Sequence, residues 1–365
     1  MQLGWIGKIV FFLNLLVGVA LALANFSSKF EPVSNPYGYL FSLAYPLFLV
    51  LNSLFVLYWI YFRKIHFLFS LVLIVFGYSN VTKLVAWNSN TKIKETPSFS
   101  IMTFNVRLLN KYNWLKEENV DEKIFEYISR ENPDIIAFQE FVDGKPLDYK
   151  KRLRNLGYRY SFKETNKKNA QNLDFFGLTT FSKYKITDSG FAFKRETSTK
   201  AISIFTDIKV NEKFIRVYNT HLNSLGFISE DYEFVENITK NSESEAIEKS
   251  KSILNKVIKA ARKRQVEVDA IVAHMTNSPH PIVVLGDFNE PPYSFAYPRF
   301  TRVLHDPFQK FGFGLGPTFD GISTLPGLRL DYILHSPTLT SNSYQTGPKN
   351  LSDHRPVSVD FSFPK

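Results

Sequence analysis

The sequence predicts an α+β protein in which three apolar helices precede a two-sheet α/β sandwich. Three features of the 365-residue chain lead to this prediction. The first 87 residues carry very little charge, the remainder mixes many strand-like runs with few helical patterns, and several of those runs end in polar groups. The first feature is typical of a membrane anchor and the second of a domain built from packed layers.

The composition excludes several classes of protein. Hydrophobic residues make up 44% of the chain and charged residues 21%, so the chain is neither disordered nor of low complexity. Cysteine is absent, which excludes disulfide scaffolds, thiolate metal sites and cysteine nucleophiles. The net charge of +10 divides equally, +5 on residues 1–98 and +5 on the remaining 267. A surplus of that size does not by itself predict a nucleic-acid-binding face.

Residues 1–87 are predicted to be a membrane anchor. Uncharged stretches cover 9–28, 32–62 and 65–82, and about 20 apolar residues in a helix cross a bilayer core. We therefore expect three transmembrane helices, at about 6–26, 39–62 and 65–85, and contact with a lipid bilayer. Two alternatives are three buried helices of a soluble domain and, for the first span, a signal peptide that ends near Ala22-Leu23-Ala24.

The charges that flank these spans predict their orientation. Arg63 and Lys64 lie between the second and third spans, which favours a cytoplasmic hairpin and places the C-terminal part on the extracytoplasmic side. Lys83, Lys92 and Lys94 would then also lie outside, against the same rule. Aromatic residues fall near the expected membrane boundaries and fit interfacial anchors: Trp5, Tyr37, Tyr39, Tyr58, Trp59, Tyr61 and Trp87.

A polar linker at 88–97 is expected to lead into a single domain at 98–365. Strand-like runs outnumber helical patterns in it, which favours two sheets packed face to face with helices outside. The predicted strands are at 98–106, 134–139, 175–181, 201–210, 213–222, 281–286, 330–335 and 357–363. The predicted helices are at 119–131 and 242–275. In the second of these, the basic residues Lys259, Arg262, Lys263 and Arg264 are expected to decorate a solvated face.

The ends of the predicted strands carry the functional signal. Charged groups are excluded from a strand's core, so a charge at its end faces a cleft or solvent. Several such ends that are rich in Asp, Glu, Asn and His have the composition of a site for a hard cation. They are Asn105, Gln-Glu at 139–140, Thr-His-Leu at 220–222, Gly-Asp-Phe-Asn at 286–289, Asp-Tyr at 331–332 and Ser-Asp-His-Arg-Pro at 352–356.

In this order, these elements resemble the endonuclease/exonuclease/phosphatase superfamily, over about residues 98–364. The resemblance implies a two-sheet α/β sandwich with the site at one edge and divalent-metal-assisted hydrolysis of phosphoesters. It implies Mg²⁺, or Mn²⁺, as the cofactor. Glu140 would be the main metal ligand, Asn105 a neutral ligand of the metal or a phosphate oxygen, and Asp353 a further ligand or a group behind one.

The resemblance also assigns catalytic roles. Asp287 would orient or deprotonate the attacking water, and Asn289 would fix its geometry. His354 would donate to a phosphoryl oxygen or transfer a proton, while Asp331 would hold its ring and keep it protonated. His221 would stabilise the charge on the phosphoryl group.

Two more residues are predicted to bind substrate. Apurinic endonucleases of the superfamily have an acidic metal ligand two residues after the equivalent of Asn105, and this chain has Arg107 there. That departure argues against a metal site of the apurinic type, and Arg107 is expected to contact a substrate phosphate instead. Asn223, at the end of the strand that carries His221, is also expected to contact substrate.

The substrate class stays open between a nucleic acid and a phospholipid. A nuclease-type phosphoesterase is the first expectation, because Asn219 and His221 resemble deoxyribonuclease-like and sphingomyelinase-like members. A lipid phosphodiesterase or phosphatase is the second, because the anchor would hold the site near headgroups, and 227–234 and 311–319 are candidate aromatic loops. A tethered binding module without activity is the third. The sequence identifies no protein partner.

Overall fold

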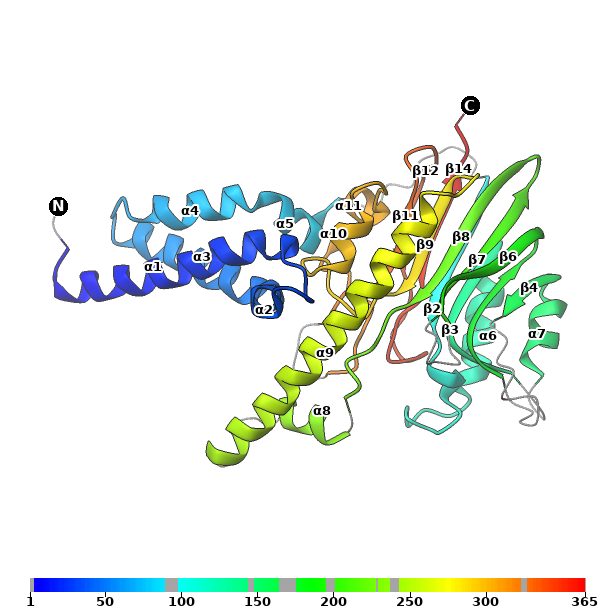
Figure 1. The fold of residues 1–365 in the computed structure, drawn as a ribbon, viewed down its shortest axis with the longest axis horizontal. Coiled ribbons are helices and arrows are strands. Elements are labelled where there is room, and N and C mark those ends of the chain that lie inside the picture. Colours follow the sequence, from blue (N-terminus) through cyan, green and yellow to red (C-terminus); the bar gives the residue numbers. More distant parts are fainter. Residues whose placement is uncertain are drawn as a thin grey trace.

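The computed structural model describes residues 3–88, 98–143, 148–163, 175–194, 201–227, 229–236, 243–322 and 327–364. An elongated helical bundle at one end adjoins an α/β sandwich at the other (Figure 1). Residues 89–97, which make up nearly all of the predicted linker, lie outside the described residues.

The N-terminal bundle consists of five helices. They are α1 (Trp5–Phe26), α2 (Pro36–Leu43), α3 (Tyr45–Tyr61), α4 (Phe67–Phe76) and α5 (Tyr78–Leu84), with a short 3-10 helix η1 (Ser27–Lys29) after α1. Among the described residues, α1 is by itself long and apolar enough to cross a bilayer, while α2–α3 and α4–α5 qualify only if each bent pair is one span. The bends are 56° and 66°. Pro46 in the first turn of α3 has no N–H to bond back toward α2, and Gly77 separates α4 from α5.

The bundle buries a polar network and exposes much of its apolar surface. Asn14 of α1, Asn52 of α3 and Ser70 of α4 are completely buried and hydrogen-bonded to one another through Ser70, at 2.7 and 2.9 Å. Leucine, valine and phenylalanine side chains of the same helices are exposed, among them Phe12, Leu54 and Val72. Of the aromatic residues expected at the membrane boundaries, Tyr39 and Trp59 are buried and Trp59 donates to Asn14, so those two are not interfacial anchors.

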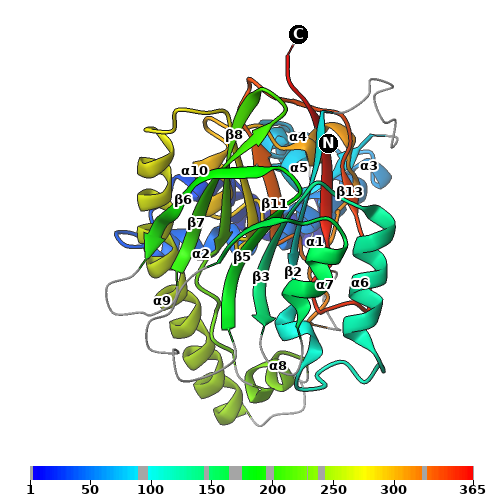
Figure 2. The same ribbon diagram turned by 90° about the vertical axis from the view of Figure 1, so that its right-hand side faces the viewer.

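Two sheets form the sandwich, and α6 and α7 lie on one side of it with α9 on the opposite side (Figure 2). The first sheet contains β2 (Phe99–Asn105), β3 (Ile135–Asp143), β4 (Tyr160–Lys163), β5 (Phe175–Ser182), β12 (Thr340–Ser341), β13 (Gln345–Thr346) and β14 (Val357–Ser362). The second contains β6 (Lys185–Lys194), β7 (Ala201–Val210), β8 (Lys213–His221), β9 (Ile282–Asp287) and β11 (Asp331–His335), in the order β11-β9-β8-β7-β6. Two residues each of β1 (Ala86–Trp87) and β10 (Phe313–Gly314) form a separate ladder.

The remaining elements surround these sheets. The helices are α6 (Val120–Glu131), α7 (Tyr149–Asn155), α8 (Ser229–Glu236), α9 (Glu243–Met275), α10 (Ala296–Phe300) and α11 (Pro307–Phe311), with a 3-10 helix η2 (Arg107–Asn110). The predicted sandwich and each of the eight predicted strands are confirmed. Strands β4 and β6 and the two-residue strands β1, β10, β12 and β13 have no counterpart in the prediction. The burial of β6 is that of a solvated edge strand, which has no clear hydrophobic alternation.

Alternation along the strands builds three hydrophobic layers. On β2, Ile101 faces the other sheet and packs with Val217 and Leu285, whereas its neighbour Met102 faces α6 and packs with Ile124. On the outer face of the second sheet, Val284 packs against α9 and α10. Because both sheets are packed on their faces in this way, the ends of their strands can hold polar groups in fixed positions.

Candidate active site

The strand ends that carry the predicted residues meet at one edge of the sandwich. Strands β2 and β3 run parallel with Asn105 opposite Gln139, and β8 and β9 run parallel with His221 opposite Asp287. Strand β11 is antiparallel to β9, and its first residue, Asp331, pairs with Asp287. The carboxyl ends of four strands and the start of a fifth thus converge, although they are far apart in the sequence.

A cavity of about 470 Å³ lies at this edge, and eight of the ten predicted residues line it. They are Asn105, Arg107, Glu140, His221, Asp287, Asn289, Asp353 and His354. The two that do not line it are Asp331, which lies behind His354, and Asn223, whose side-chain amide donates to the Ser224 carbonyl at 2.6 Å. The structure therefore groups the predicted metal and catalytic residues and leaves Asn223 aside.

Asp287 is at the centre of this group. One carboxylate oxygen, Oδ2, accepts a hydrogen bond of 3.0 Å from the Asn105 amide and lies 3.5 Å from His221 Nε2 and 3.6 Å from His354 Nε2. The other, Oδ1, accepts from the Asn289 backbone N–H at 2.8 Å. Both oxygens are therefore held in place, and Oδ2 lies between the Asn105 amide and the imidazole rings of His221 and His354.

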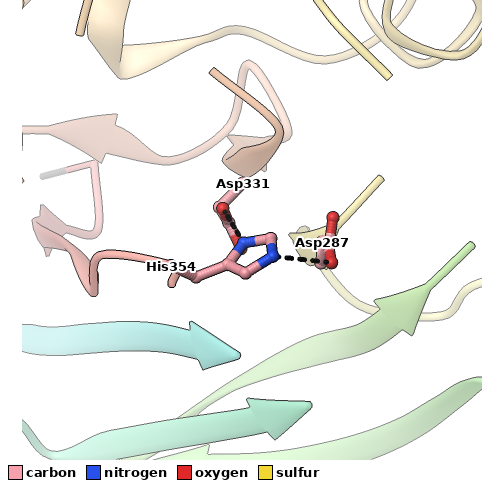
Figure 3. Close-up of side chains that lie close together, drawn as sticks. All are labelled: Asp287, Asp331 and His354. Atoms are coloured by element: carbon pink, nitrogen blue, oxygen red, sulfur yellow. Dashed lines mark hydrogen bonds and ion pairs between the residues drawn. The ribbon is translucent and has the colours of Figure 1, made fainter. Parts of the chain in front are cut away.

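His354 is oriented by Asp331, as Figure 3 shows. Its Nδ1 lies 2.8 Å from Asp331 Oδ2, which leaves Nε2 directed at Asp287. Burial acts to lower the pKa of His354, but the carboxylates of Asp331 and Asp287 outweigh it and raise the pKa to about 10. Burial in turn raises the pKa of Asp331, and the histidine opposes that rise. The two carboxylates therefore favour the protonated ring, in which Nε2–H is a hydrogen-bond donor to negative charge.

Glu140 enters the cavity through an irregularity in β3. The register with β5 slips between Phe138 and Phe141, so that two residues of β3 face one of β5. Glu140 has φ of +52°, which is uncommon for a residue other than glycine. Such bulges re-aim side chains next to active sites. Here the carboxylate comes within 3.9 Å of His221 Nε2.

Gly286 brings the two parallel strands together beside the site. Its φ is +130°, and a Cβ at this position would collide with the Thr220 carbonyl of β8. No side chain fits between β8 and β9 there. Glycine at 286 therefore permits the close approach that holds His221 and Asp287 side by side.

Arg107 and Asp353 pair with each other across the cavity mouth. Arg107 Nη1 lies 2.8 Å from Asp353 Oδ2, and the guanidinium also lies over the Trp114 ring. The side-chain amide of Asn289 also has a hydrogen-bond partner, because it donates to the Leu222 carbonyl at 3.0 Å. Asn289 therefore positions Asp287 through its backbone N–H, while its side chain holds its own loop to β8.

The carboxylates of the site offer oxygen ligands for a metal. Asp287, Asp331 and His354 each present one ligand atom within 4.8 Å of the others. The hydrogen bond between His354 Nδ1 and Asp331 already uses one atom of each residue. These three residues are therefore better arranged to orient His354 as a hydrogen-bond donor than to coordinate a metal ion. Among the described residues, the Glu140 carboxylate forms no hydrogen bond of this kind.

Two groups of polar residues next to the cavity were given no role in the site by the sequence analysis, although Gln139 and Asn219 were named in its motifs. Gln139 of β3 donates to Asn219 Oδ1 of β8 at 2.7 Å, and the Asn219 amide donates to the Phe138 carbonyl at 3.0 Å, so buried amides join the two sheets directly below Glu140. The second group joins Tyr39, Arg264 and Glu290. Arg264 is buried, so its assignment to a solvated face was wrong.

The comparisons with known proteins agree with this geometry. A model of the Endonuclease/Exonuclease/phosphatase family matches residues 102–354, which is more than half of the chain. The chain belongs to this family. A second model, described as a domain of unknown function, matches residues 7–84. Comparison with curated protein sequences finds no match.

Comparison with solved structures finds similar chains. The human Nocturnin catalytic domain is 20% identical, with a TM-score of 0.50, over 75% of this chain and 96% of that one. An AP endonuclease from Archaeoglobus fulgidus is 18% identical, with a TM-score of 0.48, over 72% of this chain and 99% of that one. At 20% identity, the likeness to the Nocturnin catalytic domain shows the fold alone.

Proposed function

We propose that this protein is a membrane-anchored phosphoester hydrolase that depends on Mg²⁺ or Mn²⁺. The observation that carries the proposal is the arrangement around Asp287, where a buried carboxylate lies between two imidazoles in a cavity that also contains Glu140. This set can bind a cation, position a water and donate hydrogen bonds to a phosphoryl group at the same time.

The donor set fits a hard divalent cation. Glu140 would hold the metal, with Asn105 and Asp353 as further oxygen donors, because carboxylate and amide oxygens are the ligands that Mg²⁺ prefers. When bound, the ion would neutralise charge on the phosphoryl oxygens. Arg107, which lines the cavity and is paired with Asp353, would contact a substrate phosphate.

The chain's own residues supply the other steps. The carboxylate of Asp287, fixed by Asn105 and Asn289, accepts a proton from a water whose oxygen forms the new bond to phosphorus. The ester P–O bond opposite the water breaks, and the departing oxygen takes up a proton from solvent. His354, charged and held by Asp331, donates to a non-bridging phosphoryl oxygen, and His221 stabilises the same charge.

Membrane anchoring is supported by the helical bundle. A water-soluble bundle buries its apolar residues and exposes its polar ones. This bundle buries the hydrogen-bonded Asn14, Asn52 and Ser70 and has a wide apolar exterior, as expected for helices that pack in lipid. We propose that α1, α2–α3 and α4–α5 form three spans, with the catalytic domain on the extracytoplasmic side.

The test uses the full-length chain in detergent with bis(p-nitrophenyl) phosphate, plasmid DNA and RNA as substrates. We expect hydrolysis of at least one phosphoester with Mg²⁺ or Mn²⁺, its loss on chelation with EDTA and its return when the metal is added back. Glu140→Gln should raise the metal concentration required for half-maximal activity. Metal binding without cleavage of any phosphoester would contradict the proposal and indicate a binding module.

A further inference from the structure

The lining of the catalytic cavity contains two chemically different sets of side chains. One set is the carboxylates, imidazoles and amides described above, and the other, called here the apolar half, is mainly apolar and aromatic. The residues of the apolar half come from α2, α9 and three loops. They are Leu43, Leu225, Phe227, Val257, Tyr293 and Ile322. When a substrate's phosphoester group is bound by the polar set, the rest of the substrate would therefore contact apolar side chains.

One wall of this apolar half belongs to the helical bundle. Helix α2 is held against the catalytic domain because the buried hydroxyl of Tyr39 donates to Glu290 Oε1 at 3.0 Å. The backbone N–H of Val33, just before α2, donates to Gln265 of α9 at 2.8 Å. Leu43, at the last turn of α2, thus becomes part of the cavity lining.

The apolar half is also continuous with the core of the bundle. Tyr293 lines the cavity and packs in one cluster with Leu21 of α1 and Tyr45 of α3. The rings of Tyr293 and Tyr45 are 5.9 Å apart. Helices α1, α2 and α3 belong to the bundle that adjoins the sandwich (Figure 1), and their exposed apolar side chains are the surface on which we base membrane anchoring.

The charges of the cavity do not suit a polyanion. Two arginines occur among the described residues that line it, and each is neutralised by a carboxylate: Arg107 by Asp353 and Arg264 by Glu290. A nucleic-acid strand is held mainly by unpaired cations along its phosphates. An apolar chamber beside a single phosphoester site fits an amphiphile with one headgroup and a hydrocarbon tail.

We propose that the substrate is a phospholipid of the bilayer, with its headgroup ester at Asp287 and His354 and an acyl chain in the chamber lined by Leu43, Leu225 and Val257. This inference rests on the proposed function and narrows it to one substrate class. The bundle then has a second role besides anchoring, because α2 supplies part of the substrate site. The candidate aromatic loops contribute Phe227 and Phe319 to the same cavity.

The test compares lipids with their own deacylated headgroups. The full-length enzyme in detergent is given dihexanoyl phosphatidylcholine, phosphatidylglycerol and phosphatidylinositol below their micelle thresholds, each beside the corresponding glycerophosphodiester, together with single-stranded DNA and bis(p-nitrophenyl) phosphate. Burial of a few methylene groups favours binding by roughly tenfold or more. We therefore expect at least one acylated substrate to exceed its deacylated form by about tenfold in kcat/KM.

A matched pair of variants locates the chain-binding half. Leu225→Asp introduces a charge into the chamber and should reduce the ratio of acylated to deacylated kcat/KM about tenfold. Val303→Asp is the control, because Val303 is an exposed apolar residue outside the cavity lining and outside both aromatic loops, and its ratio should stay at the wild-type value.

The outcomes separate the two proposals. Equal rates on acylated and deacylated forms, or DNA as the best substrate, would overturn the lipid inference and leave the hydrolase proposal intact. Failure to cleave any of the phosphoesters, including bis(p-nitrophenyl) phosphate, would overturn the hydrolase proposal itself. The comparison of wild-type substrates requires no variant, so misfolding of Leu225→Asp cannot hide either result.

Discussion

Two buried charged clusters flank the same cavity, and they differ in how completely their atoms are hydrogen-bonded. In the first, Glu290 accepts from Arg264 and Tyr39 on one oxygen and from Ser294 and the Ala296 N–H on the other, at 2.7 to 3.0 Å. In the second, Asp287 Oδ2 has one hydrogen bond from Asn105, and its two imidazole neighbours stay at 3.5 and 3.6 Å.

The difference separates a structural role from a chemical one. A buried charge whose lone pairs are all used is stable and inert, and the Arg264–Glu290 pair joins α9, α2 and the loop after β9 without capacity for another partner. The group around Asp287 still has atoms in the cavity that can form further hydrogen bonds or bind a ligand, and a substrate and a metal can use them. Burial by itself does not distinguish these roles; hydrogen-bond completeness does.

The largest expected effect tests the Asp287 side of this comparison. Asp287→Asn and His354→Ala should each lower kcat on the best phosphoester by about 10²–10⁴-fold or more, because each removes a positioned proton acceptor or a donor to the phosphoryl charge. Asp287→Asn keeps the shape of the side chain and should lower the melting temperature in detergent less than His354→Ala, which leaves the Asp331 carboxylate buried without its partner. A loss below tenfold in either variant would show that the residue has another role.

The next effect tests the other cluster. Arg264→Met leaves the Glu290 carboxylate buried without its cation and should lower the free energy of unfolding by about 3–5 kcal/mol, measured by denaturation in detergent. The kcat of the folded fraction should fall far less than in Asp287→Asn. Adding Glu290→Gln removes the unpaired charge and should recover part of the stability. A cost under about 1 kcal/mol for Arg264→Met would mean that the pair does not hold this junction.

The same contrast explains what could be predicted from sequence. Asp287 and His354 lie in short local motifs at strand ends, so their type and order predicted a shared site that the fold then assembled. Arg264 has its partners 26 and 225 residues away, and within α9 it resembles any basic residue of an exposed face. Nothing local distinguishes a buried arginine of that kind, and the wall that α2 adds to the cavity depends on it.

The fold shows a similar division. Strands with strong hydrophobic runs, such as β2 and β9, were predicted almost to the residue because burial on both faces determines their composition. Strand β6 is at an edge and mostly solvated, so its sequence carries a weak pattern. The bend between α2 and α3 follows from docking of Tyr39 on the sandwich as well as from Pro46, and docking has no local signature.

The smallest expected effect concerns an ion pair near the site that is only partly buried. Arg355 donates to both oxygens of Asp320 at 2.6 Å, and this pair holds the loop of Asp353 and His354 against the segment at 318–320. The hydrogen bonds from Arg355 hold the pKa of Asp320 below its usual value, although burial opposes them. Because the pair is partly solvated, Asp320→Asn should cost only about 1 kcal/mol at neutral pH.

The pH dependence of this effect has a definite sign. A carboxyl group whose pKa is lower in the folded state than in the unfolded state stabilises the fold above about pH 4 and loses that contribution as the pH falls through its folded pKa. The difference in unfolding free energy between wild type and Asp320→Asn should therefore shrink as the pH is lowered below about 4. Asp188→Asn, at an exposed position on β6, is the control for loss of a surface charge. A difference that stays constant with pH would show that the ionised form of Asp320 does not stabilise the loop, and the contrast with the fully buried Arg264–Glu290 pair would then be sharper still.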